Sequence, residues 1–171
     1  AQIMMRFEET VLHEKPDLVL VYGDVNSTVA AALVCAKLLI PVVHVEAGLR
    51  SFDRTMPEEI NRLMTDQIAD LLFTPSQDGD ENLVREGVAR EKVHLVGNVM
   101  IDTLVRLLPE AESLWPRLSS DLNVTERQYC LVTLHRPSNV DDPSMLAQIV
   151  STLGEVSRAL PIVFPIHPRT R

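Results

Sequence analysis

The sequence predicts an α/β fold built on a doubly wound, mostly parallel sheet. Short apolar, β-branched runs alternate with longer stretches whose apolar residues recur at helical spacing. Ionisable residues follow several of these runs directly, which is typical of the strand ends where open parallel sheets bind ligands. With 171 residues and 46% hydrophobic content, the chain has enough apolar material for a core.

The first part of the chain repeats one unit, an apolar strand followed by an amphipathic helix. Gly87 comes at the point where a helix is expected to end. In chain order, the expected elements are a helix over 3–11, strand 17–22, helix 27–39, strand 42–45, helix 57–68, strand 71–74, helix 78–86, strand 92–96 and helix 100–107.

Residues 109–127 interrupt this alternation with Pro109, Pro116, two consecutive serines and several charges, and they are the expected linker between two lobes. The predicted first lobe is 1–108 and the predicted second lobe begins at 128 and runs to 171. The elements expected after the linker are a strand over 129–134, a helix over 143–160 and a strand over 162–166.

Composition restricts the class of protein. The net charge of −8, from 16 basic and 24 acidic residues, opposes a large nucleic-acid footprint or binding to an anionic membrane surface. No run approaches the roughly 18 apolar residues of a membrane span, and no secretory leader pattern is present. Cys35 and Cys130 lie among apolar neighbours and are expected to be small buried hydrophobes, so the expected compartment is the reducing cytoplasm.

The first candidate site motif is the turn from Gly23 to Thr28, between a strand and a helix. Glycine lets the backbone approach a ligand closely, Asn26 or Ser27 can cap the helix, and exposed N–H groups at a helix start suit an anion. The alternative is a simple capped helix start, with Asp24 favoured there by the helix dipole.

The second motif follows the strand over 42–45. Glu46 comes directly after that apolar strand, where a carboxylate needs a partner or a raised pKa, and such a group suits general acid or base catalysis. Glu58 and Glu59 begin a helix behind Pro57, a position that the dipole alone explains. Arg62 is either functional or a surface partner of these glutamates. His44, inside the strand, is interpreted as a core residue.

The third motif pairs a histidine with an arginine at two strand ends. His135 and Arg136 follow one strand, and His167 and Arg169 follow the next. A titratable imidazole beside a permanent cation suits a phosphoryl group. The alternative is that both histidines are structural.

Together these residues resemble the non-hydrolysing UDP-N-acetylglucosamine 2-epimerase family, in order and nearly from end to end. The motifs that carry the resemblance are Gly23-Asp24, His44 to Arg50, Pro57-Glu58-Glu59-x-Asn61-Arg62, Gly97-Asn98 with Ile101-Asp102, Thr133-x-His135-Arg136 and Pro165-x-His167-Pro168.

The resemblance implies two Rossmann-like lobes of the glycosyltransferase-B type and interconversion of UDP-N-acetylglucosamine and UDP-N-acetylmannosamine, without a nicotinamide or a required metal. UDP leaves C1 as the C2 proton is removed, giving 2-acetamidoglucal, and then adds back. By position, the resemblance implies catalytic roles for Asp24, Glu46, Glu58 and His135, and substrate or UDP binding by Arg62, Arg136 and His167. It also implies a homodimer for the full-length protein.

Several family segments have no counterpart in these residues. They are the N-terminal strand with its Gly-Thr-Arg-Pro-Glu loop, a Gln-His segment, and the later Asp-Ser-Gly-Gly and Glu-Glu motifs. The expectation is therefore an internal part of a longer enzyme, with the first lobe lacking its start and the second most of its C-terminal part. The alternatives are a hydrolysing epimerase that releases UDP and N-acetylmannosamine, and a nucleotide-sugar-binding module without turnover.

Overall fold

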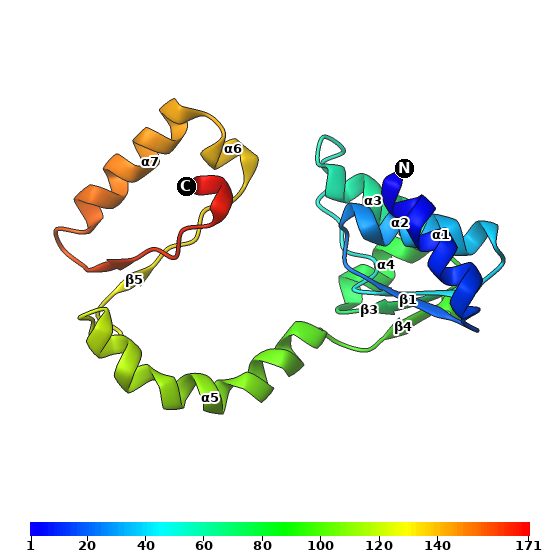
Figure 1. The fold of residues 1–171 in the computed structure, drawn as a ribbon, viewed down its shortest axis with the longest axis horizontal. Coiled ribbons are helices and arrows are strands. Elements are labelled where there is room, and N and C mark those ends of the chain that lie inside the picture. The colour runs from blue at the N-terminus through cyan, green and yellow to red at the C-terminus, as the bar shows by residue number, and fades with distance from the viewer. The chain divides into compact units, whose positions relative to one another are not determined.

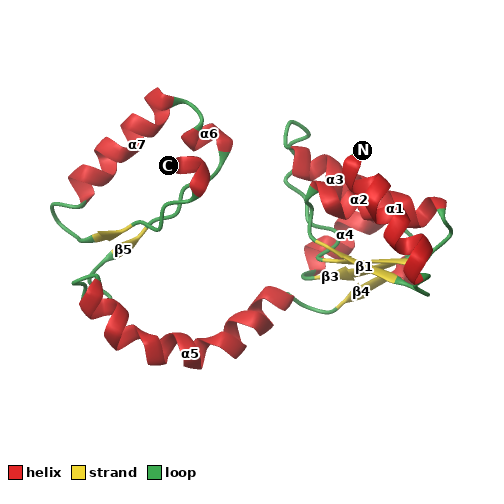
Figure 2. Cartoon of the chain, viewed as in Figure 1, coloured by secondary structure: helices red, strands yellow, loops and turns green.

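A computed structural model describes all residues, 1–171, and the chain divides into two compact units. Unit 1 is Ala1–Val105 and unit 2 is Arg106–Arg171. Helices and strands alternate along most of the chain, as Figures 1 and 2 show.

Unit 1 is organised around a four-stranded sheet in the order β1-β2-β3-β4. The strands are β1 (Val19–Tyr22), β2 (Val42–Val45), β3 (Leu71–Thr74) and β4 (Val93–Leu95). Every pairing is parallel, with Val45 opposite Tyr22 on one side and Phe73 on the other. All four residues of β2 are buried, as expected for a central strand of a parallel sheet.

Four helices join and cover these strands: α1 (Gln2–Glu14), α2 (Asn26–Lys37), α3 (Pro57–Ile68) and α4 (Gln77–Arg85). Helix α2 contacts both α1 and α3, and the three lie side by side in Figure 1. The core contains Ala32, Val42, Leu72 and Leu83 together with Cys35, which is fully buried as predicted. Cys130, in unit 2, is only half-buried.

Helix α5 (Val99–Asp121) is much longer than the sequence pattern predicted. The predicted end at 107 is wrong, because the helix continues through Pro109 and Pro116. An internal proline removes one backbone hydrogen bond and bends a helix without necessarily ending it. These two prolines are separated by about two turns, so both bends have nearly the same direction, and α5 is visibly arched in Figure 1. The role of 109–127 as a linker stays a prediction.

Unit 2 contains two short parallel strands, β5 (Cys130–Leu131) and β6 (Ile162–Val163). Both are shorter than predicted, because each has only one neighbouring strand with which to pair. A short helix that the pattern did not predict, α6 (Pro137–Val140), precedes α7 (Pro143–Val156), whose first turn is capped by Asp142 through Ser144 N. None of the helices combines the length and the hydropathy that a membrane crossing requires.

Candidate functional site

The turn after β1 lies against the residue that follows β2. Gly23 has a φ of +61°, and a Cβ added to it would lie 3.4 Å from Glu46 Oε2, so the Glu46 carboxylate lies over this glycine. The predicted capping of α2 by Asn26 or Ser27 is wrong: the N-cap is Val25 and makes no side-chain capping bond. Asn26 instead accepts a hydrogen bond from Asn61, because its side chain faces α3 and not its own helix.

Asp24 and Arg62 form the central ion pair of this region. Arg62 donates to Asp24 Oδ2 from Nε (2.9 Å) and from one terminal nitrogen (2.7 Å), and to Glu59 Oε2 from the other (2.9 Å). Burial lowers the pKa of Arg62, but the hydrogen bonds and charges of both carboxylates raise it by more, so the net shift of the pKa is upward. Arg62 therefore joins the end of β1 to α3 and is not a simple surface partner of the glutamates on its own helix.

Glu46 has an unusual backbone conformation. Its φ is +74°, in the left-handed region that non-glycine residues rarely adopt. The N–H groups of Glu46 and Ala47 both donate to the carbonyl of Phe73, so two successive residues oppose one residue of β3. This conformation costs roughly 1–2 kcal/mol for an L-residue, and such strain is concentrated at functional sites. The backbone thus gives Glu46 an independent reason to be a site candidate.

The neighbours Glu58 and Glu59 have very different surroundings. Glu59 is 2% exposed and accepts hydrogen bonds from Ser51 N (2.9 Å), Ser51 Oγ (3.0 Å), Phe52 N (3.1 Å) and Arg62. Burial raises the pKa of Glu59, but these hydrogen bonds together lower it below its ordinary value. Glu58 is exposed. The helix dipole acts on both glutamates alike, so the sequence did not indicate a structural role for Glu59. The spacing between Glu59 and Arg62 (i,i+3) was the available signal.

Replacing Glu59 with Gln is expected to destabilise the complete protein containing residues 1–171 by about 2 kcal/mol at neutral pH, because hydrogen bonds to a charged carboxylate are lost. Because the pKa of Glu59 is lower in the folded protein, its carboxylate stabilises the fold at pH values above the pKa that this group has in the unfolded chain. The stabilisation is lost as the pH falls through the pKa of Glu59 in the folded protein. Urea unfolding at several pH values should therefore show a shallower acid decline for Glu59→Gln than for wild type. The exposed Glu58→Gln is the control, and an equal loss in both variants would contradict the prediction.

In unit 2, the predicted histidines come together. His135 follows β5, His167 follows β6, and their ring centroids are 5.6 Å apart. Arg169 N donates to His167 Nδ1 (3.1 Å), so this nitrogen acts as an acceptor. Arg136 is exposed, whereas Arg169 is engaged by Asp141 at 2.8 and 2.7 Å, a hydrogen-bonded pair that raises the pKa of Arg169. Of the two arginines in the His-Arg motifs, only Arg136 forms no ion pair with a carboxylate.

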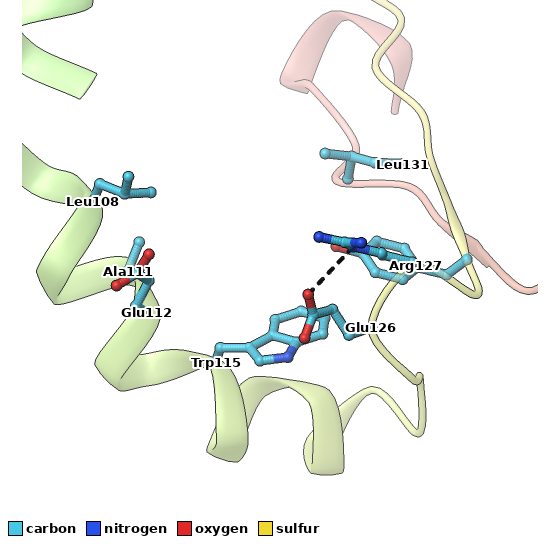
Figure 3. Close-up of a pocket in the computed structure, with 8 residues that line it drawn as sticks. Leu108, Ala111, Glu112, Trp115, Glu126, Arg127 and Leu131 are labelled. Atoms are coloured by element: carbon cyan, nitrogen blue, oxygen red, sulfur yellow. Dashed lines mark ion pairs between the residues drawn. The ribbon is translucent and has the colours of Figure 1, made fainter. Parts of the chain in front are cut away.

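A separate hollow of about 680 Å³ lies within unit 2 (Figure 3). It is bordered by Leu108 and Leu131, by the stacked rings of Trp115 and Tyr129 at 5.7 Å, and by an ion pair between Glu126 and Arg127. None of the candidate site residues lines it.

Unit 1 is a parallel α/β sheet with ionisable side chains at the carboxyl ends of its strands. Enzymes with this architecture bind nucleotide ligands at that end of the sheet. Residues 1–171, the whole chain, match the family model described as UDP-N-acetylglucosamine 2-epimerase, and the chain belongs to this family.

Relatives support this assignment. A UDP-N-acetylglucosamine 2-epimerase homolog of Methanococcus maripaludis is 48% identical over 99% of the chain and 47% of its own length. A UDP-2,3-diacetamido-2,3-dideoxy-D-glucuronate 2-epimerase of Pseudomonas aeruginosa is 46% identical, with the same two coverages. The crystal structure of the Methanocaldococcus jannaschii UDP-GlcNAc 2-epimerase, in complex with UDP-GlcNAc and UDP, superposes with a TM-score of 0.88 at 45% identity.

That superposition covers 98% of the chain and 47% of the Methanocaldococcus structure, so the chain spans about half the length of the proteins it matches. The predicted fold class, an α/β protein with Rossmann-like lobes of the glycosyltransferase-B type, is confirmed by these neighbours.

Proposed function

We propose that the complete protein containing residues 1–171 interconverts UDP-N-acetylglucosamine and UDP-N-acetylmannosamine by epimerisation at C2. The observation that carries this proposal is the match to the epimerase family over the whole chain. The contacts of Asp24, Glu46 and Arg62 support it, because they gather acid/base groups and a cation at the carboxyl ends of adjacent parallel strands.

The proposed reaction is an elimination followed by an addition. A base removes the C2 proton, the bond between C1 and the diphosphate oxygen breaks, and the electron pair of the C2–H bond forms the C1–C2 double bond of 2-acetamidoglucal. UDP then adds back to C1 while an acid delivers a proton to the opposite face of C2. The reaction is balanced without an external oxidant or reductant.

The proposed roles follow the chemistry of each side chain. Asp24, Glu46, Glu58 and His135 are the candidate acids and bases, since carboxylates and imidazole exchange protons near neutral pH when their surroundings are tuned. Arg62, Arg136 and His167 are the candidate ligands of substrate and UDP. Because Arg62 is already paired with Asp24, the diphosphate would meet a charge-compensated pair there, and the exposed Arg136 is the stronger candidate for direct phosphate binding.

A second substrate is favoured by a specific observation. The Pseudomonas relative, named for a diacetamido-dideoxy-glucuronate, is 46% identical to the chain, close to the 48% of the Methanococcus homolog. Both names describe C2 epimerisation of a UDP-linked sugar with a 2-acetamido group. The shared chemistry is therefore proposed with UDP-N-acetylglucosamine as the first substrate to test, and the diacetamido uronate as the second.

Incubation of the complete protein with each sugar nucleotide in D₂O, followed by NMR, tests the proposal. With UDP-N-acetylglucosamine the expected product is a UDP-linked mannosamine that carries deuterium at C2, and with the diacetamido uronate its C2 epimer carrying the same label, because the abstracted proton exchanges with solvent before re-addition. Free sugar plus UDP would identify a hydrolysing epimerase. Binding without conversion of either substrate would identify a nucleotide-sugar-binding module and overturn the proposed function.

A further inference from the structure

His44 lies at the centre of a buried hydrogen-bond network beneath the candidate carboxylates. Its side chain is fully buried in β2, and both ring nitrogens face oxygen atoms. Nδ1 lies 2.6 Å from Asp66 Oδ1, on α3, and Nε2 lies 2.8 Å from the carbonyl oxygen of Gly23. The histidine therefore links the end of β1 to a helix distant from it in sequence.

The partners define where the protons are. A carbonyl oxygen only accepts, so Nε2 of His44 must carry a proton. Asp66 Oδ2 accepts from Gly48 N (3.1 Å) and lies 2.8 Å from a terminal nitrogen of Arg50, so both of these partners of Oδ2 are donors. A carboxylate whose other oxygen contacts only donors accepts a hydrogen bond from Nδ1–H as well, and the ring then carries a proton on each nitrogen.

The charges of the network balance. Arg50 donates to Glu86 from Nε (2.8 Å) and from a terminal nitrogen (2.6 Å), so two cations, His44 and Arg50, face two anions, Asp66 and Glu86. The side chains of His44, Arg50 and Asp66 are all 0% exposed. Buried charges are retained only when they are paired and hydrogen-bonded in this way.

The network fixes the backbone on both sides of the candidate site. The Gly23 carbonyl immediately precedes Asp24, and the Gly48 N–H is two residues beyond Glu46. Asp66 is one helical turn beyond Arg62, the partner of Asp24. Loss of either proton of His44 would release one of these anchors, and misplacing a reacting group by about 1 Å can reduce a rate by about 100-fold.

We propose that His44 is a doubly protonated positioning residue, whose two N–H groups hold the Gly23-Asp24 turn and helix α3 in the arrangement that the epimerase reaction requires. The effect on catalysis rests on the proposed function, whereas the protonation state does not.

NMR of the complete protein labelled with ¹⁵N-histidine tests the protonation state. The expected result is that both ring nitrogens of His44 show protonated shifts at neutral pH. The resonance is assigned from single His→Gln variants, and if His44→Gln does not fold it is identified by elimination once every other histidine of the complete protein is assigned. An unprotonated Nδ1 under these conditions would overturn the proposal, whatever the activity of the protein.

Steady-state kinetics test the positioning role. We expect His44→Gln to lower kcat about 100-fold and to leave KM within about threefold, with folded sites counted by UDP-binding stoichiometry. Asp66→Asn should give the same pattern and replaces His44→Gln if that variant does not fold. The control is His94→Gln, on β4, where the ring is exposed and packs edge-on against Phe73. A normal kcat per folded site in both network variants would overturn the positioning role, and a purely structural residue would produce that result.

Discussion

Glu46→Gln in the complete protein is expected to lower turnover by about 1,000-fold and to change the affinity for UDP-N-acetylglucosamine little. Glutamine keeps the size of the side chain but cannot accept or deliver the proton at C2, and general acid/base groups contribute about 100- to 10,000-fold. Single-turnover kinetics and calorimetric titration with UDP-N-acetylglucosamine measure the two quantities separately. Unchanged turnover would remove Glu46 from the mechanism.

Glu46→Gly separates the chemistry from the backbone strain at the same position. Glycine adopts a φ of +74° without the penalty of an L side chain, while its greater freedom in the unfolded chain opposes this gain. The free energy of unfolding should stay within about 1 kcal/mol of wild type, although turnover is lost. A large destabilisation would show that the side chain of Glu46 supports the fold and does not act mainly in catalysis.

Gly48→Ala should have the largest effect on stability. Gly48 has a φ of +81°, and a Cβ there would lie 2.5 Å from the carbonyl oxygen and 2.8 Å from the Cα of Gly79, on α4. These are backbone atoms, so relief requires the helix to move. Backbone strain and overpacking each cost about 1–3 kcal/mol, and we expect a loss of about 2–5 kcal/mol in the free energy of unfolding, measured by urea denaturation.

Gly87→Ala is the matched control for this substitution. Gly87 has a φ of +86°, close to that of Gly48, but an added Cβ would meet no atom within 4 Å. The difference between the two variants in the loss of unfolding free energy therefore separates the clash with Gly79 from the backbone strain. Equal losses would show that α4 shifts away at little cost.

The regular elements of unit 1 were accessible from sequence because each buried strand has a continuous apolar run. The bounds of β2, α3 and β3 agree with the pattern residue by residue. The end of α5 was not accessible, because two prolines normally favour a break, and neighbouring leucines and glutamates kept the segment helical. The short strands of unit 2 depend on pairing partners that local sequence does not encode.

Within the candidate site, sequence indicated which residues were candidates but not their contacts. The ion pair between Asp24 and Arg62 joins residues 38 positions apart, and the network of His44 includes Glu86, which pairs with Arg50 from 36 positions away. Such contacts depend on how the helices pack on the sheet. The interpretation of His44 as a core residue is confirmed, but a strand pattern does not show that both of its ring nitrogens face acceptors.

The stack of Trp115 on Tyr129 has an optical consequence. Trp115 is the single tryptophan of these residues and belongs to unit 2, where its indole ring contacts an aromatic neighbour. Indole fluorescence from residues 1–171 will therefore report the unfolding of unit 2 and will not report the unfolding of the sheet of unit 1, next to which Asp24 and Glu46 lie. Far-ultraviolet circular dichroism, which detects the peptide groups of both units, is the appropriate signal for the variants of Gly48 and Glu59.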